Sequence, residues 1–274
     1  MRSRAGVKLR PTQEREKLYH LVLALRREGL SYNQIIRKIE IEHGVRLRKS
    51  HLSGWINGKH EPFGSVRPFA ATPRRELAYV IGVKMGDASM SVNRSYSYMI
   101  KLRVIDKEFA EEFAMCLSVI LGRDPPRVKW NEKTHAWHTQ LSSILLQKFL
   151  REALPRLRKV IEHCNDCVSA FLRGFFDSEG SVYRTQLRVA NTNKIVLLYV
   201  RHLLESRFGI EVGGPYLSSR GGRLVIIKGK QYHANKDCFV LAVATSSIPS
   251  YQSSIGFTII RKAKRLALAA ETLD

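Results

Sequence analysis

Two acidic residues, Asp87 and Glu179, lie near the ends of two segments of the same pattern, and together they could hold a metal ion. The segments are residues 76–89 (ELAYVIGVKMGDAS) and 168–181 (VSAFLRGFFDSEGS). Aligning Gly82 with Gly174 places Asp87 on Glu179. A pattern that recurs once along a chain indicates two copies of one structural unit.

Small residues recur at every fourth position in both segments, which puts them on one face of a helix. Such faces let two helix backbones approach closely. Glycine inside a helix costs about 1 kcal/mol relative to alanine, so its presence indicates a packing role. The small residues are Ala78, Gly82 and Gly86 in the first segment, and Ala170, Gly174 and Ser178 in the second.

If the two faces pack in parallel, Asp87 and Glu179 lie side by side at the C-terminal ends of the helices. Two neighbouring carboxylates repel each other, and the negative ends of two helix dipoles add to that repulsion. A divalent cation would relieve it, and hard oxygen ligands favour Mg²⁺. The alternative is that both acids are ordinary polar residues at helix ends, with Gly180 as a C-cap. The duplication favours the metal site.

Both segments resemble the LAGLIDADG motif of homing endonucleases, and the resemblance covers roughly residues 75–270. It implies an α+β fold in which two αββαββα halves form a DNA-binding saddle, with the motif helices at their interface. It also implies Mg²⁺-dependent hydrolysis of both DNA strands by a monomer. The first motif departs from the family pattern at Lys84, Met85 and Ala88.

The resemblance assigns further roles to residues near the acids. Asp87 and Glu179 would be the metal ligands, assisted by the backbone carbonyls of Gly86 and Ser178. The family also places a Gln or Asn near the attacking water, and the aligned positions here are Asp106, a departure, and Asn191. A basic residue near the scissile phosphate is expected, but no lysine aligns with that position.

Alternating and periodic segments after each motif predict the same order of elements in both copies. In the first copy we expect strands at 98–106, 127–133 and 135–142 and helices at 108–121 and 143–154. In the second we expect strands at 186–191 and 215–219, a hairpin over 224–243, and helices at 194–208 and 250–268.

The expected strands are apolar on one face and polar on the other, which suits a sheet that lies in the major groove. For any single polar residue, a solvated surface position is an open alternative. The expected DNA-contact residues of this face are Lys101, Arg103, Lys129, His138, Gln140, Gln186, Arg188, Lys228 and Lys230.

The N-terminal residues predict a separate three-helix module. We expect helices at 13–28, at 31–43 with a Ser31–Gln34 capping box, and at 51–57 with Ser50 as N-cap. Their apolar faces include Leu18, Leu21, Val22, Leu25, Ile35, Ile36, Ile39, Ile41, Leu52, Trp55 and Ile56.

The arrangement resembles a helix-turn-helix, which would place the third helix in the major groove. The alternative is a helical cap packed on the main domain. The expected domains are a helix-turn-helix at 1–66, a linker at 67–74, and two repeats at 75–160 and 161–274. The candidate DNA contacts are Arg46, Arg48, Lys49, His51, Ser53, Asn57 and Lys59.

The charge balance favours a polyanionic partner. Lys and Arg number 46 against 24 Asp and Glu, a net charge of +22, which is typical of nucleic-acid-binding proteins. No apolar run is long enough to span a membrane, and no signal segment is recognisable, so we expect a cytoplasmic, nucleoid-associated protein. Cys164 and Cys167 form a single CxxC after His163. Without a second ligand pair at a zinc-like spacing, we interpret them as structural or incidental.

Three other functions remain open on the sequence alone. The first is a transcription regulator on an inactive LAGLIDADG scaffold, and the two retained acids argue against it. The second is an RNA-binding intron maturase, because the sequence does not distinguish DNA from intron RNA as the partner. The third is an intein-borne nuclease. Met1 at the start and the absence of a terminal His-Asn favour a free-standing or intron-encoded enzyme instead.

Overall fold

The computed structural model of the chain describes residues 12–59, 61–62, 69–92, 97–227 and 230–272. The chain divides into two compact units, with the three N-terminal helices in the first and most of the two larger sheets in the second. None of the helices in the described part of the chain combines the length and apolar composition that crossing a bilayer requires.

The N-terminal module consists of α1 (Thr12–Arg27), α2 (Tyr32–His43) and α3 (Lys49–Ile56). The predicted capping box at the start of α2 is confirmed, since the Gln34 backbone N–H donates to the Ser31 hydroxyl and the Ser31 N–H donates to the Gln34 side chain. Gly44 ends α2 in the left-handed conformation, where glycine carries no steric penalty. The module has its own core, formed by Leu18, Val22, Leu25, Ile35, Ile39, Val45, Leu47, Leu52 and Trp55.

Two predictions for this module are wrong. Helix α3 begins two residues earlier than expected, at Lys49, so its N-cap is Arg48 and not Ser50. Ile41, expected on the apolar face of α2, is 83% exposed. It lies two residues after the buried Ile39, and a helix turns positions two apart to different faces.

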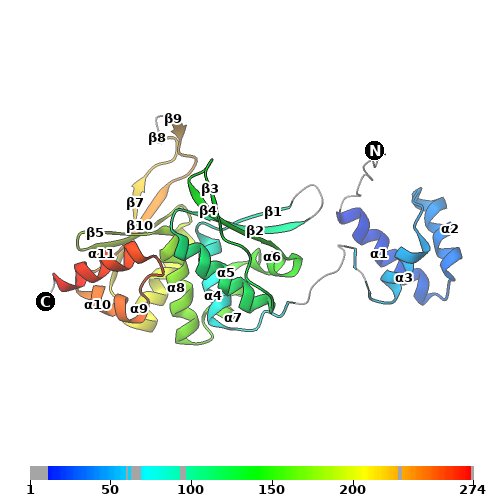
Figure 1. The fold of residues 1–274 in the computed structure, drawn as a ribbon, viewed down its shortest axis with the longest axis horizontal. Coiled ribbons are helices and arrows are strands. Elements are labelled where there is room, and N and C mark those ends of the chain that lie inside the picture. Colours follow the sequence, from blue (N-terminus) through cyan, green and yellow to red (C-terminus); the bar gives the residue numbers. More distant parts are fainter. Residues whose placement is uncertain (1–11, 60, 63–68, 93–96, 228–229, 273–274) are drawn as a thin grey trace. The chain divides into compact units, whose positions relative to one another are not determined.

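Residues 75–271 repeat one order of elements (Figure 1). The described elements of the first copy are α4 (Arg75–Met85), β1 (Ser89–Val92), β2 (Tyr98–Val104), α5 (Lys107–Leu121), β3 (Lys129–Asn131), β4 (Ala136–Ser142), α6 (Ile144–Leu150) and α7 (Leu154–Ile161). Those of the second are α8 (Asn165–Glu179), β5 (Gly180–Tyr183), β6 (Gln186–Asn191), α9 (Lys194–Phe208), β7 (Val212–Ser219), β8 (Leu224–Ile227), β9 (Lys230–His233), β10 (Cys238–Val243), a 3₁₀ turn (Thr245–Ser247), α10 (Ile248–Ser254) and α11 (Ile260–Glu271).

Each copy builds a four-stranded sheet of the same design. The strand orders are β1-β2-β4-β3 and β5-β6-β10-β7. In the second sheet β10 pairs antiparallel with both β6 and β7, and Leu241 lies opposite Val189. Two equivalent sheets from distant parts of the chain confirm the predicted duplication and the α+β fold class.

The predicted alternation along the strands is also confirmed. Ile100, Leu102 and Val104 of β2 are buried, whereas Arg103 between them is exposed. In β6 the buried Leu187 and Val189 alternate with the exposed Gln186 and Arg188. Helices cover the apolar faces (Figure 1), because these faces can leave water only by packing against other apolar surfaces.

Two expected elements of the second copy are built differently. The hairpin over 224–243 is divided, with β8 and β9 forming a separate two-stranded sheet while β10 joins the main sheet. The single helix expected over 250–268 is two helices, α10 and α11, because residues 255–259 leave the helical conformation. Gly256 in this break has a φ of +64°, which glycine adopts without strain. The short strands β1 and β5 directly after the motifs have no clear sequence signal.

Candidate metal and nucleic-acid site

Helices α4 and α8 pack side by side through their glycines, as the small-residue pattern predicts. A Cβ atom added at Gly82 would collide with the backbone carbonyl oxygen of Phe171 and lie 2.9 Å from the backbone nitrogen of Phe175. A Cβ atom at Gly174 would lie 2.5 Å from the carbonyl oxygen of Tyr79. These are backbone atoms, which cannot turn aside as a side chain can, so no other residue fits without separating the helices.

The same contact continues to the C-terminal ends of the two helices. A Cβ atom at Gly86, the C-cap of α4, would collide with the Ser178 side chain and lie 3.1 Å from Cγ of Glu179. Asp87 follows Gly86 directly, and Glu179 is the last residue of α8. The packing therefore brings the two acids from the two copies to one place.

Glu179 is half-buried and has an unusual protonation equilibrium. Burial raises the pKa of its carboxyl to about 7, and the negative charge of Asp87 adds to the increase. The Asn191 side-chain amide and the charge of Lys262 act in the opposite direction. The effect of Asp87 on Glu179 is the repulsion expected of two neighbouring carboxylates.

Asp87 is the more open of the two acids, since its side chain reaches solvent. The surrounding protein nevertheless shields it in part, which raises the pKa of its carboxyl, and the charge of Lys262 counteracts this. An open and a half-buried acid side by side leave oxygen atoms accessible from outside the helix pair.

Asn191 joins the ends of both helices. Its Nδ2 donates to Glu179 Oε1 at 3.1 Å and to the backbone carbonyl of Met85, on α4, at 3.5 Å. Its own Oδ1 accepts from the Asn193 backbone N–H at 2.8 Å, which fixes the orientation of the amide. The residue that the resemblance places near the attacking water is thus beside Glu179.

Asp106, the aligned residue of the first copy, has a different role. Its carboxylate accepts two hydrogen bonds from Arg261 of α11, at 2.7 and 2.9 Å, the bidentate geometry that favours arginine over lysine. Asp106 therefore follows the second strand of its copy as Asn191 ends the second strand of the other. Its carboxylate, however, forms an ion pair with Arg261 of α11.

Lys262, a basic residue that sequence reasoning missed, lies at the site. It is 6% exposed, and its Nζ donates to the carbonyl oxygens of Phe176 and Asp177, at 3.1 and 2.6 Å, in the last turn of α8. A cation here compensates the negative end of the helix dipole. Burial lowers the pKa of Lys262 to about 8, while nearby acids, including Asp87, raise it. Lys262 lies three residues after the buried Ile259 and four before the buried Leu266, and this helical spacing is the sequence signal that could have found it.

The buried Asp177 carboxylate binds the segment between α10 and α11, just before Lys262 in the chain. Its Oδ1 accepts from the backbone N–H groups of Thr258 (2.9 Å) and Ile259 (3.4 Å), and its Oδ2 accepts from the Tyr79 hydroxyl of α4 (2.9 Å). This acid is 1% exposed. It therefore organises the break between α10 and α11 and is not available as a metal ligand.

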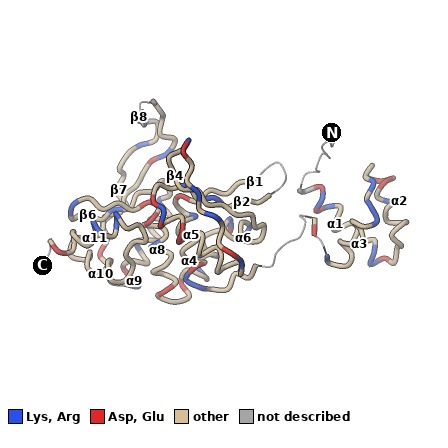
Figure 2. The backbone as a smooth tube through the Cα atoms, viewed as in Figure 1, with Lys and Arg blue, Asp and Glu red and all other residues tan. Residues whose placement is uncertain are grey.

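The other predicted DNA-contact residues have varied surroundings. Arg103, Lys129, Gln140, Gln186 and Arg188 are exposed. Lys101 and His138 are half-buried, and His138 Nε2 lies 2.8 Å from the Thr134 hydroxyl. Lys228 lies outside the described residues, and Lys230 begins β9. Figure 2 shows Lys and Arg along the strands of both sheets.

In the module, Arg46, Arg48, Lys49, His51, Asn57 and Lys59 are exposed. Ser53 is half-buried, and its hydroxyl accepts from Asn57 Nδ2 at 3.1 Å. Arg46, Arg48 and Lys49 thus lie at the N-terminal end of α3 and Lys59 follows its C-terminal end, while Ser53 and Asn57 bind each other.

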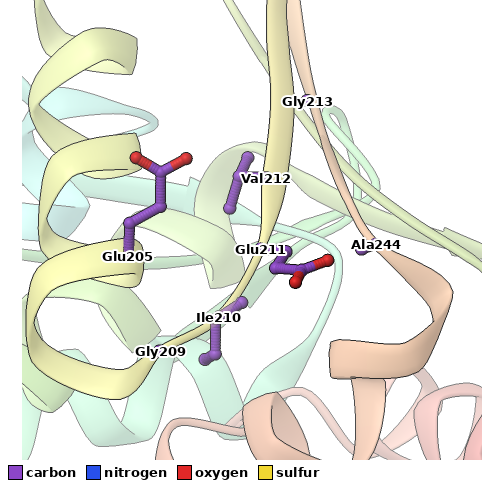
Figure 3. A pocket seen from close by; sticks show the side chains of 7 residues that line it. All are labelled: Glu205, Gly209, Ile210, Glu211, Val212, Gly213 and Ala244. Atoms are coloured by element: carbon purple, nitrogen blue, oxygen red, sulfur yellow. The ribbon is translucent and has the colours of Figure 1, made fainter.

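A separate pocket of about 500 Å³ lies at the turn between α9 and β7 (Figure 3). Glu205 and Glu211 line it together with five small or apolar residues, and none of the predicted site residues is among them. The pocket is therefore separate from the candidate site at the ends of α4 and α8.

Comparison with known proteins shows the family of the chain and its fold. Residues 166–234 match the family of LAGLIDADG-like domains. The chain is 32% identical over 263 residues to the uncharacterized protein MJ0398 of Methanocaldococcus jannaschii, covering 94% of each chain. It is 28% identical over 187 residues to a second protein of that organism, MJ0314, covering 64% of this chain and 68% of that one.

Among solved structures, the chain is similar to I-DmoI, crystallised in complex with DNA and Ca. The match covers 70% of this chain and 97% of that one, with a TM-score of 0.52 and 16% sequence identity. At this identity the match is one of fold. The chain belongs to the same family as MJ0398, and it contains a LAGLIDADG-like domain built on the fold of the homing endonuclease I-DmoI.

Proposed function

We propose that this protein is a site-specific endonuclease that hydrolyses both strands of duplex DNA with a divalent metal ion, Mg²⁺ by preference. The observation that carries the proposal is the meeting of Asp87 and Glu179 at the ends of the glycine-packed helices. Burial, with a further contribution from the charge of Asp87, raises the pKa of Glu179 to about 7 although Lys262 acts against it. A bound cation would favour the ionised form of both carboxyls.

The residues present fit such an ion. Two carboxylates and the helix-end carbonyls of Gly86 and Ser178 are hard oxygen donors, the ligands that Mg²⁺ and Ca²⁺ take. When bound, a divalent ion stabilises the charge that develops on the phosphate and on the attacking and leaving oxygens. The structure of I-DmoI with DNA and Ca supports the choice of a divalent metal and a duplex partner.

The chain's own groups prepare this site. The Asn191 side-chain amide donates one hydrogen bond to the Glu179 carboxylate and another to the Met85 carbonyl at the end of α4. Lys262 neutralises the helix end, so that both acids ionise more readily. The exposed residues of β2, β3, β4 and β6 would contact the duplex, and the N-terminal module would bind a second stretch of DNA.

The engagement of Asp106 by Arg261 favours one alternative. Where the resemblance expects an amide near the attacking water, the first copy has a carboxylate in an ion pair. If the first copy cannot orient the attacking water, the chain would bind duplex DNA without cutting both strands. A regulator on a LAGLIDADG scaffold would do the same.

Selection from a random duplex library tests both functions. The full chain is incubated with the library in Mg²⁺, and cut and bound molecules are sequenced. We expect one recognition sequence with breaks in both strands. Asp87→Asn and Glu179→Gln should each abolish cutting while binding in Ca²⁺ persists.

Asp124→Asn and Glu271→Gln serve as controls, because they neutralise exposed acids elsewhere on the chain. A wild-type chain that enriches one sequence but cuts neither strand would establish the binding function instead. Normal cutting by both site variants would show that the active site is elsewhere.

A further inference from the structure

Three side chains of types that can ligate a metal ion, His163, Cys164 and Cys167, lie together at the N-terminal end of α8. One ligand atom of each residue, a ring nitrogen or a sulfur, lies within 4.8 Å of the other two. The sequence places His163 directly before a CxxC that has no second ligand pair. The turn between α7 and α8 brings the ring of His163 close to both sulfur atoms.

We propose that these three residues bind one Zn²⁺ ion. In a tetrahedral zinc site, bond lengths of about 2.3 Å to sulfur and 2.0 Å to nitrogen place neighbouring ligand atoms roughly 3.5 to 4 Å apart. The separations in the free chain exceed this by about 1 Å at most, which small side-chain rotations supply. Three protein ligands leave the fourth position for water or a further donor.

The backbone around the cluster is held in place by its neighbours. Glu162, which precedes His163, accepts from Arg158 Nε at 2.6 Å and from the Tyr199 hydroxyl at 2.8 Å. Its backbone carbonyl accepts from Arg207 of α9 at 3.5 Å. Cys167 is 2% exposed in the first turn of α8. The ligands therefore need little ordering when the ion binds.

The exposure and charge of the cluster suit an ion from solution. His163 is exposed and Cys164 half-buried, so the ion can enter from one side, while Cys167 supplies a ligand from the core side. Two thiolates would neutralise the charge of Zn²⁺, and the N-terminal end of α8 stabilises negative sulfur.

This site is distinct from the acid pair in place and in chemistry. A helix rises about 1.5 Å per residue, so Cys164 and Glu179 at opposite ends of α8 are separated by roughly 20 Å. Sulfur and imidazole ligands select Zn²⁺, whereas carboxylates select Mg²⁺. A zinc ion would tie α7 to α8 and so support the helix that presents Glu179.

Cobalt substitution of the reduced full-length chain tests the proposal. We expect one equivalent of Co²⁺ to give thiolate-to-cobalt charge-transfer bands and the intense visible bands of tetrahedral coordination, and one equivalent of Zn²⁺ to displace it. Cys164→Ser should lower the charge-transfer intensity to that of one thiolate and weaken Co²⁺ binding at least tenfold, and His163→Ala should weaken binding similarly while both thiolate contributions remain.

Cys238→Ser is the matched control, because this cysteine is half-buried on β10 and outside the cluster. It should bind Co²⁺ as the wild type does. Since Cys167→Ala opens a space in the core, the conclusion depends on the two more exposed ligands. The proposal fails if the reduced chain gives no stoichiometric thiolate bands, or if Cys164→Ser binds Co²⁺ with the band intensity and affinity of the wild type. Isolation of the chain with a Cys164–Cys167 disulfide that persists under reducing conditions would also overturn it.

Discussion

Arg261 and Asp106 form a two-point ion pair that links the last helix of the second copy to the end of a strand in the first. Arg261 Nε lies 2.7 Å from Oδ1 of Asp106, and Nη2 lies 2.9 Å from Oδ2. Asp106 and Asn191 are equivalent positions in the two copies, but their partners differ. Asp106 binds Arg261, whereas Asn191 donates to Glu179.

Arg261→Met should lower the free energy of unfolding by about 1 to 2 kcal/mol, because the Asp106 carboxylate, whose side chain is 11% exposed, loses both donors. Urea denaturation measures the change. Arg265→Met, an exposed arginine of the same helix, should change stability by less than about 0.5 kcal/mol. If Asp106→Asn in the Arg261→Met background restores nothing, the ion pair does not cause the loss.

Lys262→Met should shift metal-dependent cleavage to higher pH. The charge of Lys262 lowers the pKa of Glu179, and the metal site needs that carboxyl ionised, so removing the lysine moves the acidic limb of the pH profile upward. Without its bonds to two α8 carbonyls, the chain should also lose about 1 to 3 kcal/mol of stability.

Lys264→Met is the control for this change, since Lys264 is an exposed lysine two residues away. An equal loss of activity at every pH in Lys262→Met would show a structural role alone.

Glu179→Gln should stabilise the metal-free chain above pH 7. The folded pKa of about 7 exceeds the ordinary value of 4.5, so the contribution of this proton to stability is complete below pH 4.5 and lost as the pH rises through 7. Glutamine mimics the protonated form at every pH. After allowance for the partial exposure of Glu179, the gain should reach about 1 to 2 kcal/mol.

Thermal unfolding in EDTA at a series of pH values measures this difference. It should shrink as the pH falls from 7 toward 4.5, and Mg²⁺ should stabilise the wild type selectively. A variant less stable than the wild type above pH 7 would contradict the strained acid pair.

Gly82→Ala should force α4 and α8 apart and lower the free energy of unfolding by about 1 to 3 kcal/mol, despite the better helix propensity of alanine. The added methyl group would collide with the carbonyl of Phe171. Chemical denaturation checks this, with Ser206→Ala on the exposed face of α9 as a neutral comparison. Unchanged stability in Gly82→Ala would mean that the helices pack less closely.

Arg48→Ala combined with Lys49→Ala should weaken DNA binding and reduce the slope of log affinity against log salt by about one for each phosphate that is no longer bound. The cut positions should stay the same, because the acid pair is unchanged. Arg37→Ala, an exposed arginine of α2, is the comparison. An unaltered salt slope in the double variant would indicate that the module does not bind DNA through this end of α3.

The sequence by itself determined the paired helices, the position of the two acids and the alternation of the strands. Each of these follows from local periodicity: small residues four apart, apolar residues two apart, and an acid at the same place in both copies. The capping box of α2 is equally local, since Ser31 and Gln34 lie within one turn.

Only the tertiary structure decided which charges surround those acids. Lys262 reaches carbonyls 85 and 86 residues away along the chain, and Arg261 reaches Asp106 across 155 residues. No periodicity connects such partners. The break between α10 and α11 was hidden for the same reason, because the buried carboxylate of Asp177 holds Thr258 and Ile259 there. A local pattern specifies which face of an element is apolar, but the pairing of buried charges depends on which elements the whole fold brings together.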